Sequence, residues 1–185
     1  MPKRKVVVPP IVVQGVGYKC WAAALESWLR ITPNRRVFTM NELLGYAMPL
    51  RTGFDVTLDK KGKEEPMPPG AINARIFKVL LEDNFLNLRM EYQEFPGRGS
   101  VPDETFCEYL AYYQCHLYVV YTPGNANTDI RHANVVYSAD EEGNLEVMDP
   151  QAGMIMKKTA SKLGSPMLIG WRDPTSSILE SVGYS

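Results

Sequence analysis

The sequence predicts an α+β protein in which an N-terminal helical lobe packs on a C-terminal antiparallel β-sheet. After Cys20, apolar residues recur at three- and four-residue intervals, the spacing of a helix with one buried face. Between residues 117 and 171 the chain changes to short apolar runs separated by turn-rich segments, which is typical of paired strands. Because the helical patterns precede the strand patterns, we expect two lobes with a cleft between them.

The individual elements follow from spacing and capping. Helices are predicted over residues 20–30, from Thr39 onward, over 71–82 and over 103–114. Thr39 and Glu42 have the spacing of a capping box, which supports a helix start at that point. Residues 53–70 are rich in charges, Pro and Gly, so we expect a long loop there. Strands are predicted over residues 86–92, 117–121, 132–138, 145–148 and 167–171.

Length and composition limit the classes of protein that fit. A chain of 185 residues can bury a core without disulfides, and we expect one domain over residues 1–175 with a flexible polar tail at 176–185. Twenty basic residues nearly cancel twenty-one acidic ones, which leaves no footprint for nucleic acid or an anionic membrane. No apolar run reaches the roughly 18 residues of a membrane helix, so membrane insertion is not expected.

The N-terminus has a basic start followed by valines, which superficially resembles a signal peptide. Pro9 and Pro10 interrupt the apolar run, and no small-residue cleavage site follows. We therefore expect no cleavable signal and a protein that is cytoplasmic where it is made. Export into a target cell by a specialised secretion system is the alternative.

The three cysteines are expected to be thiols. Cys107 and Cys115 are predicted on or beside one helix, about 12 Å apart along its axis, which is too far for a disulfide. Thiols suit a reducing compartment. The two histidines and three cysteines have no metal-ligand spacing, so no metal or other cofactor is expected.

Cys20 is the cysteine whose position suggests chemistry. It lies where the first helical pattern begins, and a helix N-terminus favours the thiolate, the nucleophilic form of the side chain. Taken alone, a cysteine before an apolar helix is more often a small buried residue. A nucleophilic cysteine also needs a nearby imidazole base, a group that orients the imidazole, and donors for the oxyanion.

The segment from Gln14 to Ala22 reads Gln-Gly-Val-Gly-Tyr-Lys-Cys-Trp-Ala. It resembles the nucleophile segment of papain-like cysteine proteases, in which a Gln six positions before the Cys supplies an oxyanion-hole amide and a Trp follows the Cys. Tyr18 and Lys19 replace the Gly-Ser or Gly-Ala pair that precedes the Cys in papain-type sequences. The resemblance implies that Cys20 is the nucleophile and that Gln14 binds the oxyanion.

The second half of the chain supplies the base. His132 opens a predicted strand, and after a hairpin turn at 140–144 a second strand ends in Asp149-Pro150. This order resembles the His strand of the bacterial branch of the papain-like superfamily, which includes C39-like peptidases and effector-type proteases. Antiparallel strands joined by a tight turn bring their far ends together, so we expect Asp149 to accept a hydrogen bond from His132. The other histidine, His116, lies at a helix-to-strand junction.

The resemblance implies a papain-like fold and a thiol protease that hydrolyses peptide bonds through a Cys20–His132–Asp149 triad, as in bacterial effectors and toxins. The expected partners are a protein or peptide substrate and a cognate inhibitor or immunity protein. Further residues expected at the substrate cleft are Tyr18, Trp21 and Arg131. Two other hypotheses stay open: the same triad acting as a deamidase, transglutaminase or acyltransferase, and a papain-like scaffold used only for binding.

Overall fold

The computed structural model describes residues 6–32, 36–51, 56–58, 64–83, 86–95, 103–113, 116–122, 131–163 and 165–172. Its helices are α1 (Cys20–Ile31), α2 (Met40–Leu50), α3 (Ala74–Glu82), α4 (Asp103–Tyr113) and α5 (Ala160–Leu163). Its strands are β1 (Val56–Leu58), β2 (Glu64–Pro66), β3 (Met90–Glu94), β4 (Leu117–Thr122), β5 (His132–Ala139), β6 (Leu145–Asp149), β7 (Met154–Lys158) and β8 (Ser165–Arg172).

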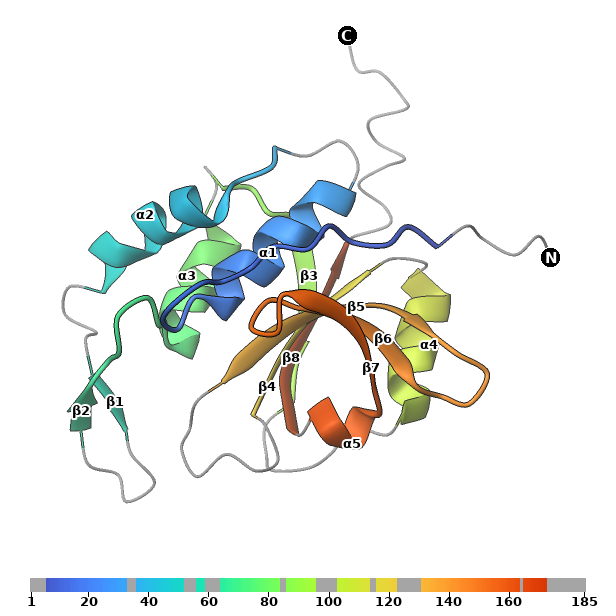
Figure 1. Ribbon diagram of the computed structural model, residues 1–185. Helices are drawn as coiled ribbons and strands as arrows, with labels where there is room; N and C mark the ends of the chain where they lie inside the picture. Colours follow the sequence, from blue (N-terminus) through green and yellow to red (C-terminus); the bar gives the residue numbers. More distant parts are fainter. Residues whose placement is uncertain are drawn as a thin grey trace, which may run out of the picture.

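Six of the strands form one antiparallel sheet in the order β3-β8-β4-β5-β6-β7 (Figure 1). Strands β1 and β2 form a separate two-stranded antiparallel pair. Most helical residues precede the main run of strands along the chain, whereas α4 lies in the crossover from β3 to β4 and α5 in that from β7 to β8. The fold is therefore α+β, as the sequence predicts in general terms.

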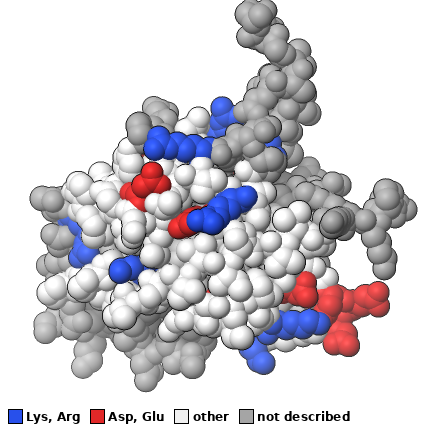
Figure 2. All heavy atoms as spheres, turned by 45° about the horizontal axis from the view of Figure 1, so that its top comes forward, with Lys and Arg blue, Asp and Glu red and all other residues white. Residues whose placement is uncertain are grey.

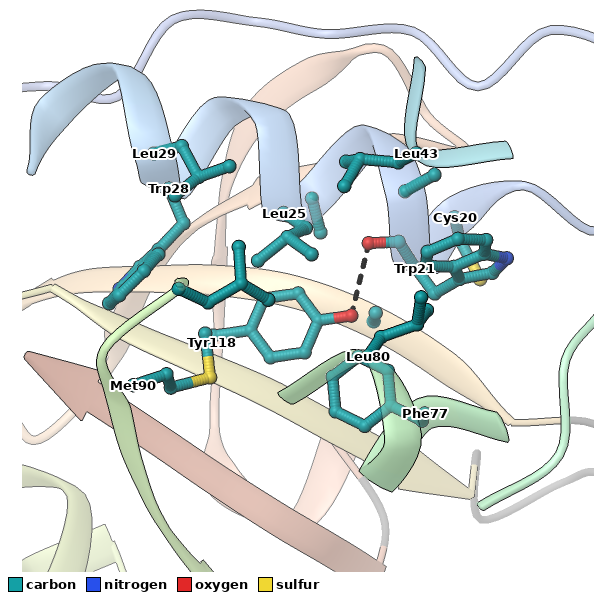
Figure 3. Packing of buried hydrophobic residues seen from close by; sticks show 14 of the residues in the cluster. Cys20, Trp21, Leu25, Trp28, Leu29, Leu43, Phe77, Leu80, Met90 and Tyr118 are labelled. Atoms are coloured by element: carbon teal, nitrogen blue, oxygen red, sulfur yellow. Dashed lines mark hydrogen bonds between the residues drawn. The ribbon is translucent and has the colours of Figure 1, made fainter. Parts of the chain in front are cut away.

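The first core lies between α1, α2, α3 and one face of the sheet (Figure 3). Ala22, Ala23 and Ala24 have no exposed surface, and such small side chains let α1 approach β4 and β5 closely. The Tyr118 hydroxyl donates to the Trp21 carbonyl oxygen at 3.0 Å, and the dashed line in Figure 3 marks this bond. It ties the first turn of α1 to the centre of the sheet.

The second core lies on the opposite face, beneath α4 and α5. Successive sheet residues contribute to the two cores in alternation: Tyr118 belongs to the first, whereas Leu117 and Val119 belong to the second. Phe106 from α4 and Leu163 from α5 are fully buried in this second core. The sheet is thus covered on both sides, and β4 and β5 run through its middle.

An extended N-terminal segment, residues 6–19, runs beside α1 (Figure 1). Four hydrogen bonds attach its backbone to the body of the protein, one of them from the Tyr18 N–H to the Pro69 carbonyl at 3.4 Å. The His116 ring donates to the Val7 carbonyl at 2.5 Å, and Ser27 Oγ donates to the Pro10 carbonyl at 2.7 Å. The Gln14 backbone N–H donates to the Pro150 carbonyl at 3.0 Å. The last bond brings this segment to the end of the strand that carries Asp149.

Helix α2 begins as the sequence predicts. Thr39 accepts from the Glu42 amide, and Glu42 accepts from the Thr39 amide, which completes the capping box. The buried Glu26 of α1 accepts from the Met40 amide at 2.6 Å and pairs with Arg30. A buried carboxylate is tolerated there because the α2 N-terminus and a cation neutralise it.

Several boundaries differ from the sequence-based expectations. Residues 53–70, expected as a loop, include the paired strands β1 and β2. The strand expected over residues 86–92 begins only at Met90, because Asn87 and Arg89 have positive φ angles of 40° and 44°, outside the β region. Strand β7 and helix α5 were not expected at all. The predicted tail, 176–185, lies outside the described residues.

Two further properties concern the described part of the chain. None of its helices is long and apolar enough to cross a membrane. Cys20 and Cys107 form no disulfide among the described residues, as expected for thiols, whereas Cys115 lies outside those residues. On the face shown in Figure 2, the described Lys, Arg, Asp and Glu side chains form small groups of mixed sign rather than a patch of one sign.

Candidate active site

Cys20 is the first residue of α1, and its side chain is nearly buried, with 8% exposed. The N-cap residue is Lys19, and no side chain caps this helix start. The positive end of the helix and its first N–H groups therefore lie beside the sulfur. The Cys20 thiol is 3.8 Å from the carbonyl oxygen of Arg131, the residue immediately before β5. The nucleophile predicted from the sequence thus lies at the start of the strand that carries His132.

His132 is the first residue of β5 and is also nearly buried. Its Nε2 is 3.0 Å from Asp149 Oδ1, so Nδ1 is the ring nitrogen left for the thiol. Burial disfavours the imidazolium, but hydrogen bonds with Asp149 and Cys20 outweigh it and raise the pKa of His132 to about 9. The ring is therefore cationic near neutral pH, which is the state that accompanies a thiolate.

Asp149 ends β6 and is held by four hydrogen bonds. Besides His132, the amides of Gln151 and Ala152 donate to Oδ1 at 2.9 and 3.1 Å, and Lys158 Nζ donates to Oδ2 at 2.6 Å. Burial opposes ionisation, yet the bonds from His132 and Lys158 hold the pKa of Asp149 well below its ordinary value. The carboxylate is therefore charged and fixed in one orientation.

Strand pairing explains why His132 and Asp149 meet. In the β5–β6 pair, Val135 lies opposite Met148, so Asp149 is one residue beyond that pair and close to the beginning of β5. The Asp140–Asn144 turn sets the register at the hairpin end: Asp140 Oδ1 accepts from the Asn144 backbone N–H at 2.9 Å, and the Gly143 φ angle of 81° suits a glycine. A register shift between Val136 and Ser138 then sets the pairing nearer the site. The expected hydrogen bond between His132 and Asp149 is present.

An open pocket of about 430 Å³ lies over the thiol. Its lining comes from the N-terminal segment, the start of α1, the start of β5 and the turn after β6: Gln14, Gly15, Gly17, Tyr18, Cys20, Arg131, His132 and Gln151. Gly15 and Gly17 have φ angles of 66° and 99°, values that favour glycine. This wall of the pocket is therefore backbone rather than side chain, which lets an extended chain approach the sulfur.

Gln14 lines the pocket with Cys20, as expected for an oxyanion-binding residue. Its Nε2 donates to the Gly17 carbonyl at 3.0 Å, and an amide nitrogen carries a second N–H. Its Oε1 is buried and has no hydrogen-bond partner among the described residues. Because buried polar atoms are normally paired, this arrangement is typical of a side chain fixed for a function rather than for stability.

The three residues expected at the substrate cleft have different positions. Tyr18 and Arg131 are exposed and line the pocket. Trp21 is only 6% exposed and belongs to the first core, where its indole N–H donates to the Gly70 carbonyl at 2.9 Å. The structure therefore brings Tyr18 and Arg131 to the pocket, whereas Trp21, expected at the cleft, packs in the core.

Sequence reasoning missed three residues that surround Asp149. The Asn134 amide is best satisfied with its oxygen facing Tyr121 Oη at 3.0 Å and Lys158 Nζ at 3.2 Å. Lys158 Nζ also lies 3.3 Å from Tyr121 Oη. Burial raises the pKa of Tyr121 far above its ordinary value, so this hydroxyl stays neutral. Lys158 follows another lysine on an unexpected strand, and no local pattern singles it out.

The other histidine, His116, has a structural role. The His116 ring bonds the Val7 carbonyl and stacks near Tyr137, with ring centroids 6.3 Å apart, so it is committed to holding the N-terminal segment. Within the described residues, no group of His, Cys, Asp and Glu side chains has the arrangement of a metal site. Of the described titratable groups, Tyr18, Cys20, Arg131 and His132 line the pocket, and Asp149 and Lys158 lie behind His132.

No protein-family model matches the chain, and no curated protein sequence matches it.

Proposed function

We propose that the protein is a cysteine peptidase of the papain-like class, with Cys20 as nucleophile, His132 as general base and acid, and Asp149 as the group that orients the imidazole. The observation that carries the proposal is the position of a nearly buried thiol at a helix N-terminus with no side-chain cap. Beside it lies a buried ion pair of cationic His132 and anionic Asp149. An ordinary core cysteine needs none of these features.

The chemical steps follow from the geometry. The Cys20 thiolate attacks the carbonyl carbon of a peptide bond, and the resulting oxyanion accepts hydrogen bonds from the Cys20 backbone N–H and from Gln14 Nε2. The imidazolium of His132 gives its Nδ1 proton to the leaving amine, which departs and leaves a thioester. His132 then removes a proton from water, the hydroxide attacks the thioester, and the Cys20 thiolate is released with the acid product.

The substrate we propose is a protein or peptide in an extended conformation. The glycine-lined wall of the pocket and its open shape support a main chain passing over the sulfur, rather than a compact small molecule. The resemblance to effector-type proteases extends the proposal to a protein of a target cell as substrate, with an immunity protein as the natural antagonist. Deamidation and acyl transfer use the same nucleophile: deamidation attacks a side-chain amide and releases ammonia, and transfer passes the acyl group to an acceptor other than water.

The decisive test compares the wild-type protein with Cys20→Ala. After exposure of a proteome to each protein, labelling of new N-termini should reveal cleavage sites with the wild type and none above background with Cys20→Ala, while the melting temperature changes little. A mass gain of about 1 Da on an intact target would assign deamidation instead. Equal cleavage by both proteins would refute the mechanism.

A second test needs no substrate. Cys107 forms no disulfide among the described residues and is more exposed than Cys20, so accessibility alone predicts faster alkylation of Cys107. Activation by the helix N-terminus and His132 predicts the opposite order with iodoacetamide at pH 6. Peptide mapping by mass spectrometry reads both rates in one sample. Faster labelling of Cys107 would show that Cys20 is an inert thiol.

A further inference from the structure

A buried lysine lies behind the candidate site, on the side of Asp149 that faces away from His132. Lys158 comes from β7, and its side chain is only 14% exposed. A lysine ammonium has three N–H groups. Here it has three neighbours within hydrogen-bonding distance: Asp149 Oδ2 at 2.6 Å, Asn134 at 3.2 Å and Tyr121 Oη at 3.3 Å. Such a complete set of partners is uncommon for a lysine, which normally keeps its charge in water.

The adjacent lysine shows what the ordinary situation looks like. Lys157 is on the same strand, its side chain is 62% exposed, and it pairs with Asp140 in the hairpin turn at 3.1 Å. Solvent screens that pair, whereas the Lys158–Asp149 pair is enclosed. Two consecutive lysines therefore each pair with an aspartate, and only one of the two aspartates contacts the candidate base.

We propose that Lys158 is a positioning residue of the candidate site. It fixes the second carboxylate oxygen of Asp149 and offsets its charge. His132 therefore releases its proton at a lower pH than it would beside a carboxylate with no cation next to it. This inference rests on the proposed roles of His132 and Asp149. It extends those roles, because Lys158 adds a fourth side chain to a series that alternates in charge: thiolate, imidazolium, carboxylate, ammonium.

The sign of the effect follows from the contacts. Asp149 Oδ1, which bonds His132, is also held by the amides of Gln151 and Ala152, so it stays in place without the lysine. Removing the ammonium deletes a positive charge near the imidazolium and leaves the whole carboxylate charge to act on His132. Both changes favour protonated His132.

The other charged or titratable groups around the pair limit the alternatives. From α1, Cys20 acts on His132 when it is ionised; from β4, Tyr121 faces Asp149 and Lys158; Tyr118 lies near Cys20 in the core. Burial raises the pKa values of both tyrosines, so neither changes charge in the working range. Among the described residues, Lys158 is the cation that contacts Asp149, whereas Arg131, which precedes His132, is exposed at the pocket.

Mechanistically, the offset matters because His132 has to give up its proton as well as hold it. An imidazolium stabilised too strongly is a weaker acid toward the leaving amine and a weaker base toward water. Because Lys158 and His132 share Asp149, the imidazolium is stabilised less. His132 can then act both as an acid toward the leaving amine and as a base toward water.

The test is an NMR titration of the histidine ring protons, which needs no substrate. With only two histidines in the chain, His116 serves as an internal reference. In Lys158→Met the midpoint of His132 should rise by roughly half a unit or more, whereas Lys157→Met should leave it unchanged. Lys158→Arg, which keeps the charge, should restore a midpoint close to that of the wild type. A midpoint that stays constant or falls in folded Lys158→Met would overturn the proposal.

Lys158→Gln provides a second neutral variant that keeps hydrogen bonding, and it should shift His132 in the same direction as Lys158→Met. If circular dichroism shows that neither neutral variant folds, Lys158 serves the fold rather than the site, and the proposal is overturned. Failure of the proposed peptidase function is read separately. A protein without cleavage activity can still show the Lys158-dependent titration, and an active protein can lack it.

Discussion

The two sides of the candidate site are built in opposite ways. His132, Asp149 and Lys158, here called the base cluster, come from three neighbouring strands, and His132 and Asp149 are only 8% and 5% exposed. Residues 14–19, here called the nucleophile loop, have no regular structure, and Val16 at the loop is 92% exposed. The charged groups are thus enclosed by the sheet, whereas the loop beside Cys20, which would admit a substrate chain under the proposed function, is open.

This contrast indicates where precision is needed. The base cluster satisfies nearly all of its hydrogen-bonding groups internally, so substrate binding has little to rearrange there. The nucleophile loop keeps an unpaired Gln14 Oε1 and two glycines at positive φ, so it is less constrained by the rest of the fold. We therefore expect substitutions in the base cluster to impair chemistry and stability together, and those in the loop to impair chemistry alone.

The largest effect is expected for Asp149→Ala. Loss of the carboxylate frees the imidazole to rotate and removes the charge that favours its cation, so the rate of cleavage should fall about 10³-fold or more. Asp140→Ala is the matched control, because Asp140 is also paired with a lysine of β7 but lies in the hairpin turn. Kinetic assays of both variants give the comparison. Comparable losses of activity in the two variants would mean that Asp149 has no role in the site beyond its pairing with a lysine of β7.

Asp149→Ala also strands Lys158 in a buried position, which should lower the melting temperature. The double variant Asp149→Ala/Lys158→Met removes both charges and should recover most of the stability without recovering activity. Recovery of both would contradict the role given to Asp149.

A smaller effect is expected on the loop side for Gln14→Ala. Removing one oxyanion donor typically costs about 10² in kcat, and this side chain bears little on the core, so the melting temperature should hold. Gln151→Ala is the control, because it removes the same type of side chain from the same pocket while leaving the backbone amide that holds Asp149. A kcat for Gln14→Ala equal to that of Gln151→Ala would exclude Gln14 from the oxyanion site.

The smallest effect is the pH dependence of stability. The pKa of His132 is raised from 6.5 to about 9, so its contribution is complete below pH 6.5 and is lost as pH rises through 9. The pKa of Asp149 is lowered, so its contribution is present above about pH 4 and is lost as pH falls further. Between pH 6.5 and 9.5 the free energy of unfolding should decrease by about 2 kcal/mol, allowing for partial solvent screening.

Urea titrations at a series of pH values measure this decrease, and His132→Gln should abolish it. A decrease of the same size in His132→Gln would assign it to other groups, and the ion pair within the base cluster would then contribute nothing to folding.

Local patterns predicted much of this arrangement. The start of α1 at Cys20, the capping box of α2 and the pairing of β5 with β6 all depend on residues close together in the sequence, and each was predicted. The proximity of His132 and Asp149 followed from a single tight turn. These features could be predicted because propensity, capping and hairpin geometry act over a few residues.

Other features depend on contacts between distant segments. Lys158 acquires its partners only because β7 pairs with β6, and nothing in its neighbours distinguishes it from Lys157. Trp21 follows Cys20 in the sequence, yet it packs in the core, where its indole N–H donates to the Gly70 carbonyl of a segment about fifty residues away. Val79 fits the apolar spacing of α3 but is 43% exposed, because helical spacing alone does not fix how wide the buried face is.

The separation of the site's parts along the chain also has a consequence during synthesis. The Cys20 thiol emerges from the ribosome long before His132 and Asp149, and β5 pairs with β4, which in turn pairs with β8. Domains assemble as units once their strands are available, at synthesis rates of roughly 5–20 residues per second. For several seconds the nascent chain carries only an ordinary cysteine. Under the proposed mechanism, the Cys20 thiol becomes reactive only once β5 and β6 have brought His132 and Asp149 beside it.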